Sequence, residues 1–355
     1  MSTERYRSRV RGCLIGGAVG DALGYPVEFL SLREIRARYG PDGITDLVGD
    51  PAPITDDTQM TLFTVEGLIR ASVRGDRGIC HPPSVVHRAY LRWLDTQRLP
   101  GPPETVDGWL ASHAFLYARR APGNACLSGL SGGRMGTPAQ PANPGSKGCG
   151  TVMRSAPFGL HPRMTAEKAF DLAAECATQT HGHPSGYLAA GAFAAVVHGL
   201  AVGGADLEAA VRSARELLRS RPDHEEVTAA LDAALALDRA ATPELVERLG
   251  GGWVAEEALA IAVYCALAHP GDARRALRAA ANHSGDSDST AAICGNLIGA
   301  WHGEAALPAD WVFRVEGRGT ILEVADDLAL EYLQGHELHG DHGPWTSWTK
   351  RYPGG

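Results

Sequence analysis

The chain has 355 residues, of which 44% are hydrophobic and 21% are charged, so it can bury a substantial core and is not expected to be disordered. Its formal net charge of −8, with Lys and Arg scattered along the chain, argues against nucleic acid or an anionic membrane as a partner. Seven cysteines without a CxxC pair fit a reducing compartment better than a disulfide framework.

The first residues resemble a signal peptide, because basic residues precede an apolar stretch. Asp21 and Glu28 follow soon, and no A-x-A-like site precedes them, so we expect this segment to belong to the mature protein. No apolar run approaches the roughly 20 residues that a membrane span needs. These features predict a soluble, cytoplasmic protein.

Helix signals dominate from the N-terminus to the C-terminus. Glycines at 12, 16, 17 and 20 interrupt the first apolar stretch and indicate close helix contacts or a breaking point, because glycine costs a helix roughly 1 kcal/mol relative to alanine. Apolar residues at helical spacing predict helices around 60–68, 211–218 and 227–235, and an Ala/Leu-rich helix at 257–268. Thr242-Pro243-Glu244 is typical of a helix start. Only "WVFRVEG" at 311–317 suggests a strand, so we expect a compact all-α domain over 1–355.

One long stretch, 121–150, is rich in Gly, Pro and Ser. A loop of this length inside a compact domain is usually functional or disordered. Because it leads directly into "GCGTVMRSAPFGL", a functional loop is favoured over an interdomain linker.

Two acidic segments, "ITDDTQM" at 54–60 and "GDSDST" at 285–290, each precede a helix. Capping a helix needs only one side-chain oxygen, so the adjacent acids are an unexplained electrostatic cost. A capped surface turn remains one interpretation of each segment, and a metal site is the other. The donors are all oxygens, which suit Mg²⁺, Mn²⁺ or Ca²⁺ rather than zinc. Four carboxylates would balance two divalent ions, and the spacing after Asp286 does not fit an EF-hand.

The order of several motifs resembles that of the ADP-ribosylglycohydrolase family, from about residue 8 to 303. The motifs are "RVRGCLIGGAVGDALGYPVEF", "TDDTQM", "RAPGNACLSGL", "GCGTVMRSAPFGL", "THGHP" and "HSGDSDSTAAICGNLIGA". Each motif alone is weak, whereas the ordered set is specific. The resemblance implies a compact, orthogonal multi-helix fold with two Mg²⁺ or Mn²⁺ ions in a cleft.

The resemblance also implies which residues bind the ions. The expected metal ligands are Thr55, Asp56, Asp57, Asp286, Asp288 and Ser289. Glu28 matches the acidic residue of a mobile loop and is expected to transfer a proton. Asp57 and Asp286 are the metal acids on which we expect catalysis to depend most. Asp21 is expected to hydrogen-bond to groups that bind the metal.

The substrate is expected to contact a second group of residues. "GCGTVMR" resembles the family's phosphate and ribose loop, in which backbone N–H groups face the ligand, although many relatives carry Asn or Ser in place of Cys149. His181 matches a histidine beside ADP-ribose, and two aromatic residues are candidates to stack on adenine. The expected substrate contacts are Gly148, Cys149, Gly150, Met153, His181, Tyr187 and Trp253.

The implied reaction is metal-dependent hydrolysis of the bond between ADP-ribose C1″ and an acceptor on a protein or small molecule. Modified arginine is the preferred acceptor, and O-linked serine or acetyl groups, nucleobases and small metabolites are alternatives. A non-catalytic or immunity-type relative that binds ADP-ribose or a protein is the alternative of another class. The presence of all four aspartates favours catalysis, and the sequence leaves the oligomeric state open.

Overall fold

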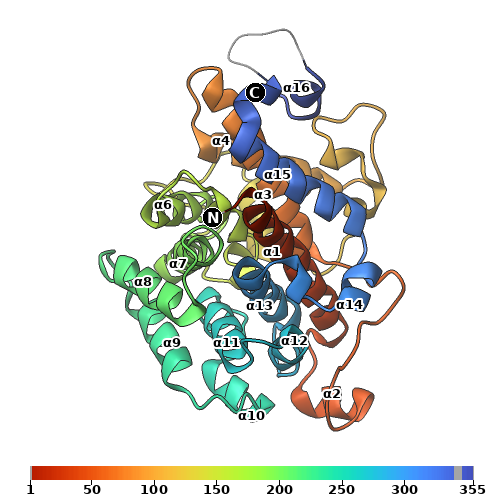
Figure 1. The fold of residues 1–355 in the computed structure, drawn as a ribbon, viewed down its shortest axis with the longest axis vertical. Coiled ribbons are helices and arrows are strands. Elements are labelled where there is room, and N and C mark those ends of the chain that lie inside the picture. The colour runs from red at the N-terminus through yellow and green to blue at the C-terminus, as the bar shows by residue number, and fades with distance from the viewer. Residues whose placement is uncertain (1, 340–345, 355) are drawn as a thin grey trace.

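A computed structural model describes residues 2–339 and 346–354, and these residues form an all-α domain (Figure 1). The α-helices are α1 (Thr3–Gly24), α2 (Leu32–Tyr39), α3 (Asp56–Asp76), α4 (Pro82–Thr96), α5 (Asn124–Ser131), α6 (Ala166–Ala177), α7 (Pro184–Ala201), α8 (Leu207–Arg219), α9 (Glu225–Ala236), α10 (Pro243–Val246), α11 (Ala255–Ala268), α12 (Ala273–Ala281), α13 (Ser287–His302), α14 (Ala309–Arg314), α15 (Arg318–His339) and α16 (Ser347–Arg351). Short 3₁₀ turns connect several of them, including η1 (Tyr25–Val27) and η4 (Cys149–Thr151). Strand pairing in this part of the chain is limited to three isolated bridges.

Helices α1 and α13 pack against each other at the centre of the domain (Figure 1). A Cβ added to Gly16 would lie 2.4 Å from the carbonyl oxygen of Gly295, and one added to Gly24 would lie 2.2 Å from that of Ser287. Only glycine allows the two backbones to approach this closely. The glycines of the first helix therefore mark close packing, one of the two expected outcomes, and they bring the end of α1 to the start of α13.

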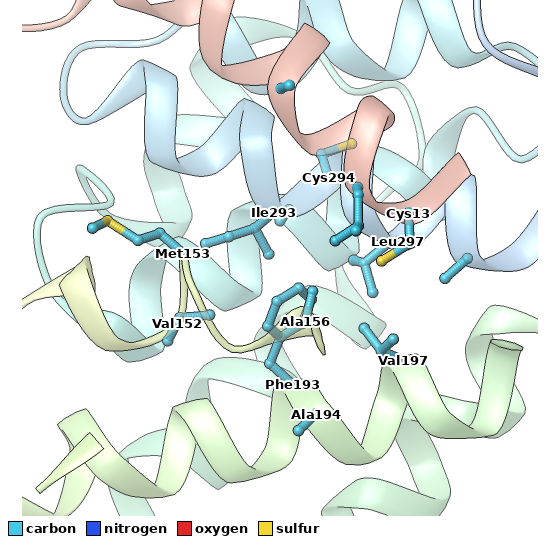
Figure 2. Packing of buried hydrophobic residues seen from close by; sticks show 14 of the residues in the cluster. Cys13, Val152, Met153, Ala156, Phe193, Ala194, Val197, Ile293, Cys294 and Leu297 are labelled. Atoms are coloured by element: carbon cyan, nitrogen blue, oxygen red, sulfur yellow. The ribbon is translucent and has the colours of Figure 1, made fainter. Parts of the chain in front are cut away.

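A continuous apolar core surrounds this central pair, as the helical spacing predicts. Figure 2 shows part of it, where Phe193 of α7 points toward Ile293 and Leu297 of α13, with Cys13 of α1 nearby. Helix α15 packs along α1 and α3 on another side. Burial of these apolar side chains fixes the helix starts that carry the acidic segments.

The prediction of a strand at 311–317 is wrong, because Ala309–Arg314 forms helix α14. Trp311 and Val315 are buried while Phe313 is 72% exposed. Positions four apart share one face of a helix, whereas alternate positions share one face of a strand, so this burial follows the helical period. Val315 makes a single parallel bridge to Ala52.

The Gly/Pro-rich stretch at 121–150 is not one continuous loop, because it contains helix α5. Cys126, Gly129 and Leu130 are buried at helical spacing, which gives this short segment an inward face. Its end forms η4, and both parts reach the cleft described below.

Within the described residues no single helix is both long and apolar enough to cross a membrane. The segments Thr3–Val27 and Leu32–Tyr39 meet that criterion only together, with a bend of 91° between them.

Candidate active site

The first acidic segment lies at the start of α3, where Thr55 is the N-cap residue. The Thr55 hydroxyl accepts a hydrogen bond from the Asp57 N–H at 3.3 Å. Asp56 and Asp57 are 4% and 3% exposed, and the Gly123 N–H donates to Asp56 Oδ2 at 3.2 Å. Asp57 Oδ1 is buried and has no hydrogen-bond partner. One threonine therefore caps the helix and leaves the two adjacent acids available for another purpose.

Asp21 of α1 lies behind this segment and fixes it in place. Its carboxylate accepts hydrogen bonds from the backbone N–H groups and hydroxyls of both Thr55 and Thr58, at distances from 2.5 to 3.1 Å. Burial, followed by repulsion from Asp288, raises the pKa of Asp21 to about 7, against the effect of these donors. Asp21 thus hydrogen-bonds to the fully buried cap residue Thr55.

The second acidic segment lies at the start of α13. The Asp286 N–H donates to Gly251 O at 2.8 Å, which holds the segment against the 250–254 loop. Asp288 and Ser289 lie in the first turn of α13, where the Ser289 N–H donates to Asp288 Oδ1 at 2.9 Å. Burial raises the pKa values of Asp286 and Asp288, and repulsion between the two acids adds to the shift of Asp286.

Glu28 joins the two segments from the end of η1. The Glu28 N–H donates to Gly24 O at 3.0 Å, so its position follows from the end of α1. One ligand atom each from Glu28, Asp286 and Asp288 lies within 4.8 Å of the other two. Burial, then repulsion from Asp288, Asp286 and Asp56, raises the pKa of Glu28 to about 11. Acids from three distant parts of the sequence therefore share one small space.

These acids form the floor of a cavity of about 440 Å³. We define the cleft floor as Asp56, Asp57, Asp286, Asp288 and Ser289. The walls include Gly148, Cys149, Gly150, Met153 and His181, and Trp253 also borders the cavity. Most of the predicted ligand and substrate residues thus lie together.

Two predicted residues lie elsewhere. Thr55 is fully buried at the N-cap and does not border the cavity, since its hydroxyl donates to Asp21 Oδ1 at 2.9 Å. Tyr187 borders a different cavity of about 330 Å³, together with Phe170 and Arg221. It lies in the first turn of α7 and does not border the cleft.

Cys149 and the backbone around it form one wall of the cleft. Its thiol lies 2.7 Å from Asp286 Oδ2 and 3.6 Å from the Ser289 hydroxyl oxygen. Burial and the charge of Asp286 raise the pKa of the Cys149 thiol, so the S–H donates to the carboxylate. The Cys149 N–H donates to Trp253 O at 3.2 Å, so this backbone donor is already used within the protein.

His181 lies behind the same wall and is 2% exposed. Its Nδ1 is 2.8 Å from the hydroxyl of Thr180, which also accepts a hydrogen bond from Arg154 Nη2 at 2.7 Å. Burial, followed by repulsion from Arg154, lowers the pKa of His181 to about 3. The ring is therefore neutral near pH 7, and its Nε2 lies on the side of Gly148.

The edge of the cleft combines the predicted Trp253 with Phe29 and Arg119, two residues that the sequence did not single out. We define the cleft rim as Phe29, Arg119 and Trp253. The rings of Phe29 and Trp253 stack with centroids 5.2 Å apart and an interplanar angle of 25°, although the side chains are 67% and 42% exposed. Phe29 has a φ of 66°, which is strained for a bulky residue. In the sequence, only two features could have indicated a role for these residues. Phe29 follows Glu28, and Arg119 directly precedes the motif "RAPGNACLSGL".

The family model of the ADP-ribosylglycohydrolases matches residues 2–337. The chain belongs to the ADP-ribosylglycohydrolase family. The ADP-ribosyl-[dinitrogen reductase] glycohydrolase of Rhodospirillum rubrum is 27% identical to this family member, over 89% of this chain and 93% of that protein. The ADP-ribosylarginine hydrolase Tri1 of Pseudomonas putida (strain GB-1) is 26% identical, over 95% of this chain and 82% of that protein.

A solved structure described as an ADP-ribosylglycohydrolase-related protein complex has a TM-score of 0.67 and 23% identity, covering 93% of this chain and all of that one. At this identity the likeness shows a shared fold. Family membership supports ADP-ribosyl glycohydrolase activity in general.

The cleft of this family member fits the divalent cations on which the family often depends. Its floor offers oxygen donors, and two buried carboxylate oxygens, Asp57 Oδ1 and Glu28 Oε2, have no hydrogen-bond partner in the protein. Burial of several carboxylates within a few ångströms is costly unless protons or cations neutralise them. Oxygen ligands of this kind suit hard divalent cations.

Proposed function

We propose that the cleft hydrolyses the glycosidic bond at C1″ of ADP-ribose attached to an acceptor, and that arginine on a protein is the preferred acceptor. The observation that carries this proposal is the convergence of Glu28 with the two acidic segments in a cavity that also has a glycine-containing wall. Its volume of about 440 Å³ lies within the usual range for small-molecule sites.

Asp56, Asp57, Asp286, Asp288 and Ser289 are the residues that would hold two Mg²⁺ or Mn²⁺ ions, with Thr55 as a further candidate ligand. When bound, the ions would neutralise the acids and orient ribose hydroxyls and water. Asp21 keeps the Asp56–Asp57 pair facing the cleft through its hydrogen bonds to Thr55 and Thr58.

Glu28 is the residue best placed to hold or move a proton. Its carboxyl group takes up a proton readily because burial, followed by repulsion from neighbouring acids, raises its pKa, and one of its oxygens has no partner in the protein. A protonated carboxyl can donate to the leaving group, and its carboxylate can then accept a proton from water. The surrounding carboxylates would stabilise the positive charge that develops on the ribose ring.

The walls and rim would hold the rest of the nucleotide. Gly148 and Gly150 allow a phosphate to approach the backbone, and the Cys149 and Met153 side chains shape the wall beside them. Neutral His181 can donate or accept one hydrogen bond through Nε2. Trp253 offers a partly exposed ring for adenine, whereas the position of Tyr187 removes the reason to assign it that role.

Arginine is preferred as the acceptor because one similar protein is described as an ADP-ribosylarginine hydrolase. The test is release of ADP-ribose from arginine-linked, serine-linked and acetyl-linked substrates, with Mg²⁺, with Mn²⁺ and in EDTA. Fastest release from the arginine adduct, lost in EDTA, supports the proposal.

Other outcomes redirect or reject the proposal. Faster release from an O-linked adduct would overturn the choice of arginine as the acceptor. Full activity in EDTA would overturn the proposed role of the ions. Binding of ADP-ribose without turnover of any adduct would favour a non-catalytic relative.

A further inference from the structure

A second group of potential ligands, two of them buried, lies at the other end of α3. Asp76, the last residue of α3, meets Glu331 and His339 of α15, with one ligand atom of each within 4.8 Å of the other two. We call these residues the Asp76–Glu331–His339 cluster. Because the cleft acids begin the same helix, about 30 Å of helix separates the two groups. The cluster is therefore distinct from the active-site cleft.

Two carboxylates converge on one imidazole nitrogen in this cluster. His339 Nε2 lies 3.2 Å from Glu331 Oε1 and 3.6 Å from Asp76 Oδ2. Neighbouring ligands of a tetrahedral zinc ion with bonds of 2.0–2.1 Å are about 3.3–3.4 Å apart. A ring nitrogen carries at most one proton, so it cannot donate a straight hydrogen bond to both acids. These two nitrogen–oxygen distances, with the two carboxylate oxygens within 4.8 Å of each other, fit three ligands of one ion.

The Glu331 carboxylate is held in a fixed orientation. Trp348 Nε1 of α16 donates to Glu331 Oε2 at 2.7 Å, and Ser72 of α3 also hydrogen-bonds to this carboxylate. These bonds direct Oε1 toward His339. Outer hydrogen bonds of this kind orient the carboxylate ligands of metal sites.

Gly335 makes room for this carboxylate within α15. A Cβ at this position would lie 2.7 Å from Glu331 Oε1. Glycine destabilises a helix interior relative to alanine, so its presence needs a structural reason. Here it allows Glu331 to extend along the helix to meet a histidine two turns later.

The charge and the exposure of the cluster also fit a cation. The side chains of Glu331 and His339 are fully buried, whereas that of Asp76 is 36% exposed and opens the cluster to solvent. Burial raises the pKa of Glu331, which shows the cost of its charge there. A divalent ion would balance the two carboxylates and could enter beside Asp76.

We propose that Asp76, Glu331 and His339 bind one zinc-type divalent cation. An imidazole with two carboxylates suits zinc better than magnesium, which prefers oxygen ligands. The ion fixes α15, and through Trp348 also α16, to the end of α3. Figure 1 shows α16 and the end of α15 near the C-terminus, at the top of the view.

The test measures zinc bound to full-length protein in which the active-site cleft has been altered so that it does not compete for zinc. The double variant Asp57→Asn/Asp288→Asn, in excess Mg²⁺, is dialysed against low zinc and analysed by mass spectrometry of the metal. We expect one zinc per chain, and none after the further change His339→Gln. Asp76→Asn should cause the same loss of zinc. Because Asp76 is exposed, this variant replaces His339→Gln in the test if His339→Gln fails to fold. Circular dichroism checks folding in each case.

Two more variants locate the ion. Trp348→Phe leaves all three ligands and should weaken zinc binding about 10- to 100-fold in calorimetry, because Glu331 loses an orienting donor. His336→Gln, on the exposed side of the same helix, should keep the full stoichiometry. The proposal is overturned if the cleft variant retains no zinc, or if it retains as much zinc after His339→Gln and Asp76→Asn as before. Loss of zinc after His336→Gln also overturns it.

Discussion

The cleft floor and the cleft rim differ in how the protein holds them. Floor carboxylates are almost fully buried at the starts of two packed helices, whereas the rings of Phe29 and Trp253 are partly exposed and contact each other. Buried, mutually repelling acids are held in place by the fold, and exposed rings can rearrange around a ligand. The floor is therefore expected to determine the chemistry and the rim to determine affinity.

The largest expected effect is on the floor itself. Asp57→Asn keeps the shape of the side chain but removes one charge, and we expect kcat/KM to fall by more than about 100-fold, because altering even the groups that orient metal ligands costs 10- to 100-fold. In EDTA the variant should unfold at the same temperature as the wild type or higher, because repulsion among the acids is relieved.

Mg²⁺ should stabilise the wild type against unfolding and have a smaller effect on Asp57→Asn. Asp42→Asn, which alters an exposed acid, is the control for a general loss of charge. If Asp57→Asn kept its activity, or lost stability in EDTA, the floor would be a structural feature rather than a metal site.

Glu28 lies between the cleft floor and the cleft rim, so a change at this residue tests whether chemistry and affinity are separable. Glu28→Gln cannot transfer a proton, so we expect kcat to fall about 100-fold or more. ADP-ribose affinity, measured by calorimetry with Mg²⁺, should change little because the floor ligands remain. An unchanged kcat would exclude Glu28 from proton transfer, and lost affinity would assign it to binding instead.

Buried groups of the wall should also make stability depend on pH. The pKa of His181 is lowered from 6.5 to about 3 in the folded protein. Above pH 6.5 both folded and unfolded states are neutral at this residue. Below it the unfolded state binds a proton that the folded state cannot, so stability falls as the pH drops toward 3. Between pH 7 and 5 this loss is about 2 kcal/mol.

Urea unfolding at pH 7 and pH 5 measures this loss. His181→Gln should lose about 2 kcal/mol less than the wild type over that interval, while Phe29→Ala, a change in the rim, should keep the wild-type difference. Equal pH dependence in wild type and His181→Gln would show that the histidine titrates normally in the folded protein.

The floor acids could be located from the sequence because they occupy adjacent or alternate positions at the start of a helix. Such short spacing fixes their geometry once the helix start is known. Tyr187 could not be placed this way, because its direction depends on the rotation of α7 in the core. The stack of Phe29 on Trp253 joins segments far apart in the chain, and nothing local to either residue predicts it. Likewise, α14 was missed because tertiary burial of Trp311 and Val315 decides its period.

The smallest expected effect concerns the rim. Phe29→Ala removes one ring of the stacked pair, and because such pairs contribute about 0.5–1.5 kcal/mol, we expect KM to rise up to about tenfold with kcat unchanged. Trp253→Ala should give a similar rise. Since the two rings act as one unit, the double variant should show little more than either single change rather than the product of both. Multiplying effects, or a fall in kcat, would mean that the rim also positions the reacting groups, and the division between floor and rim would then fail.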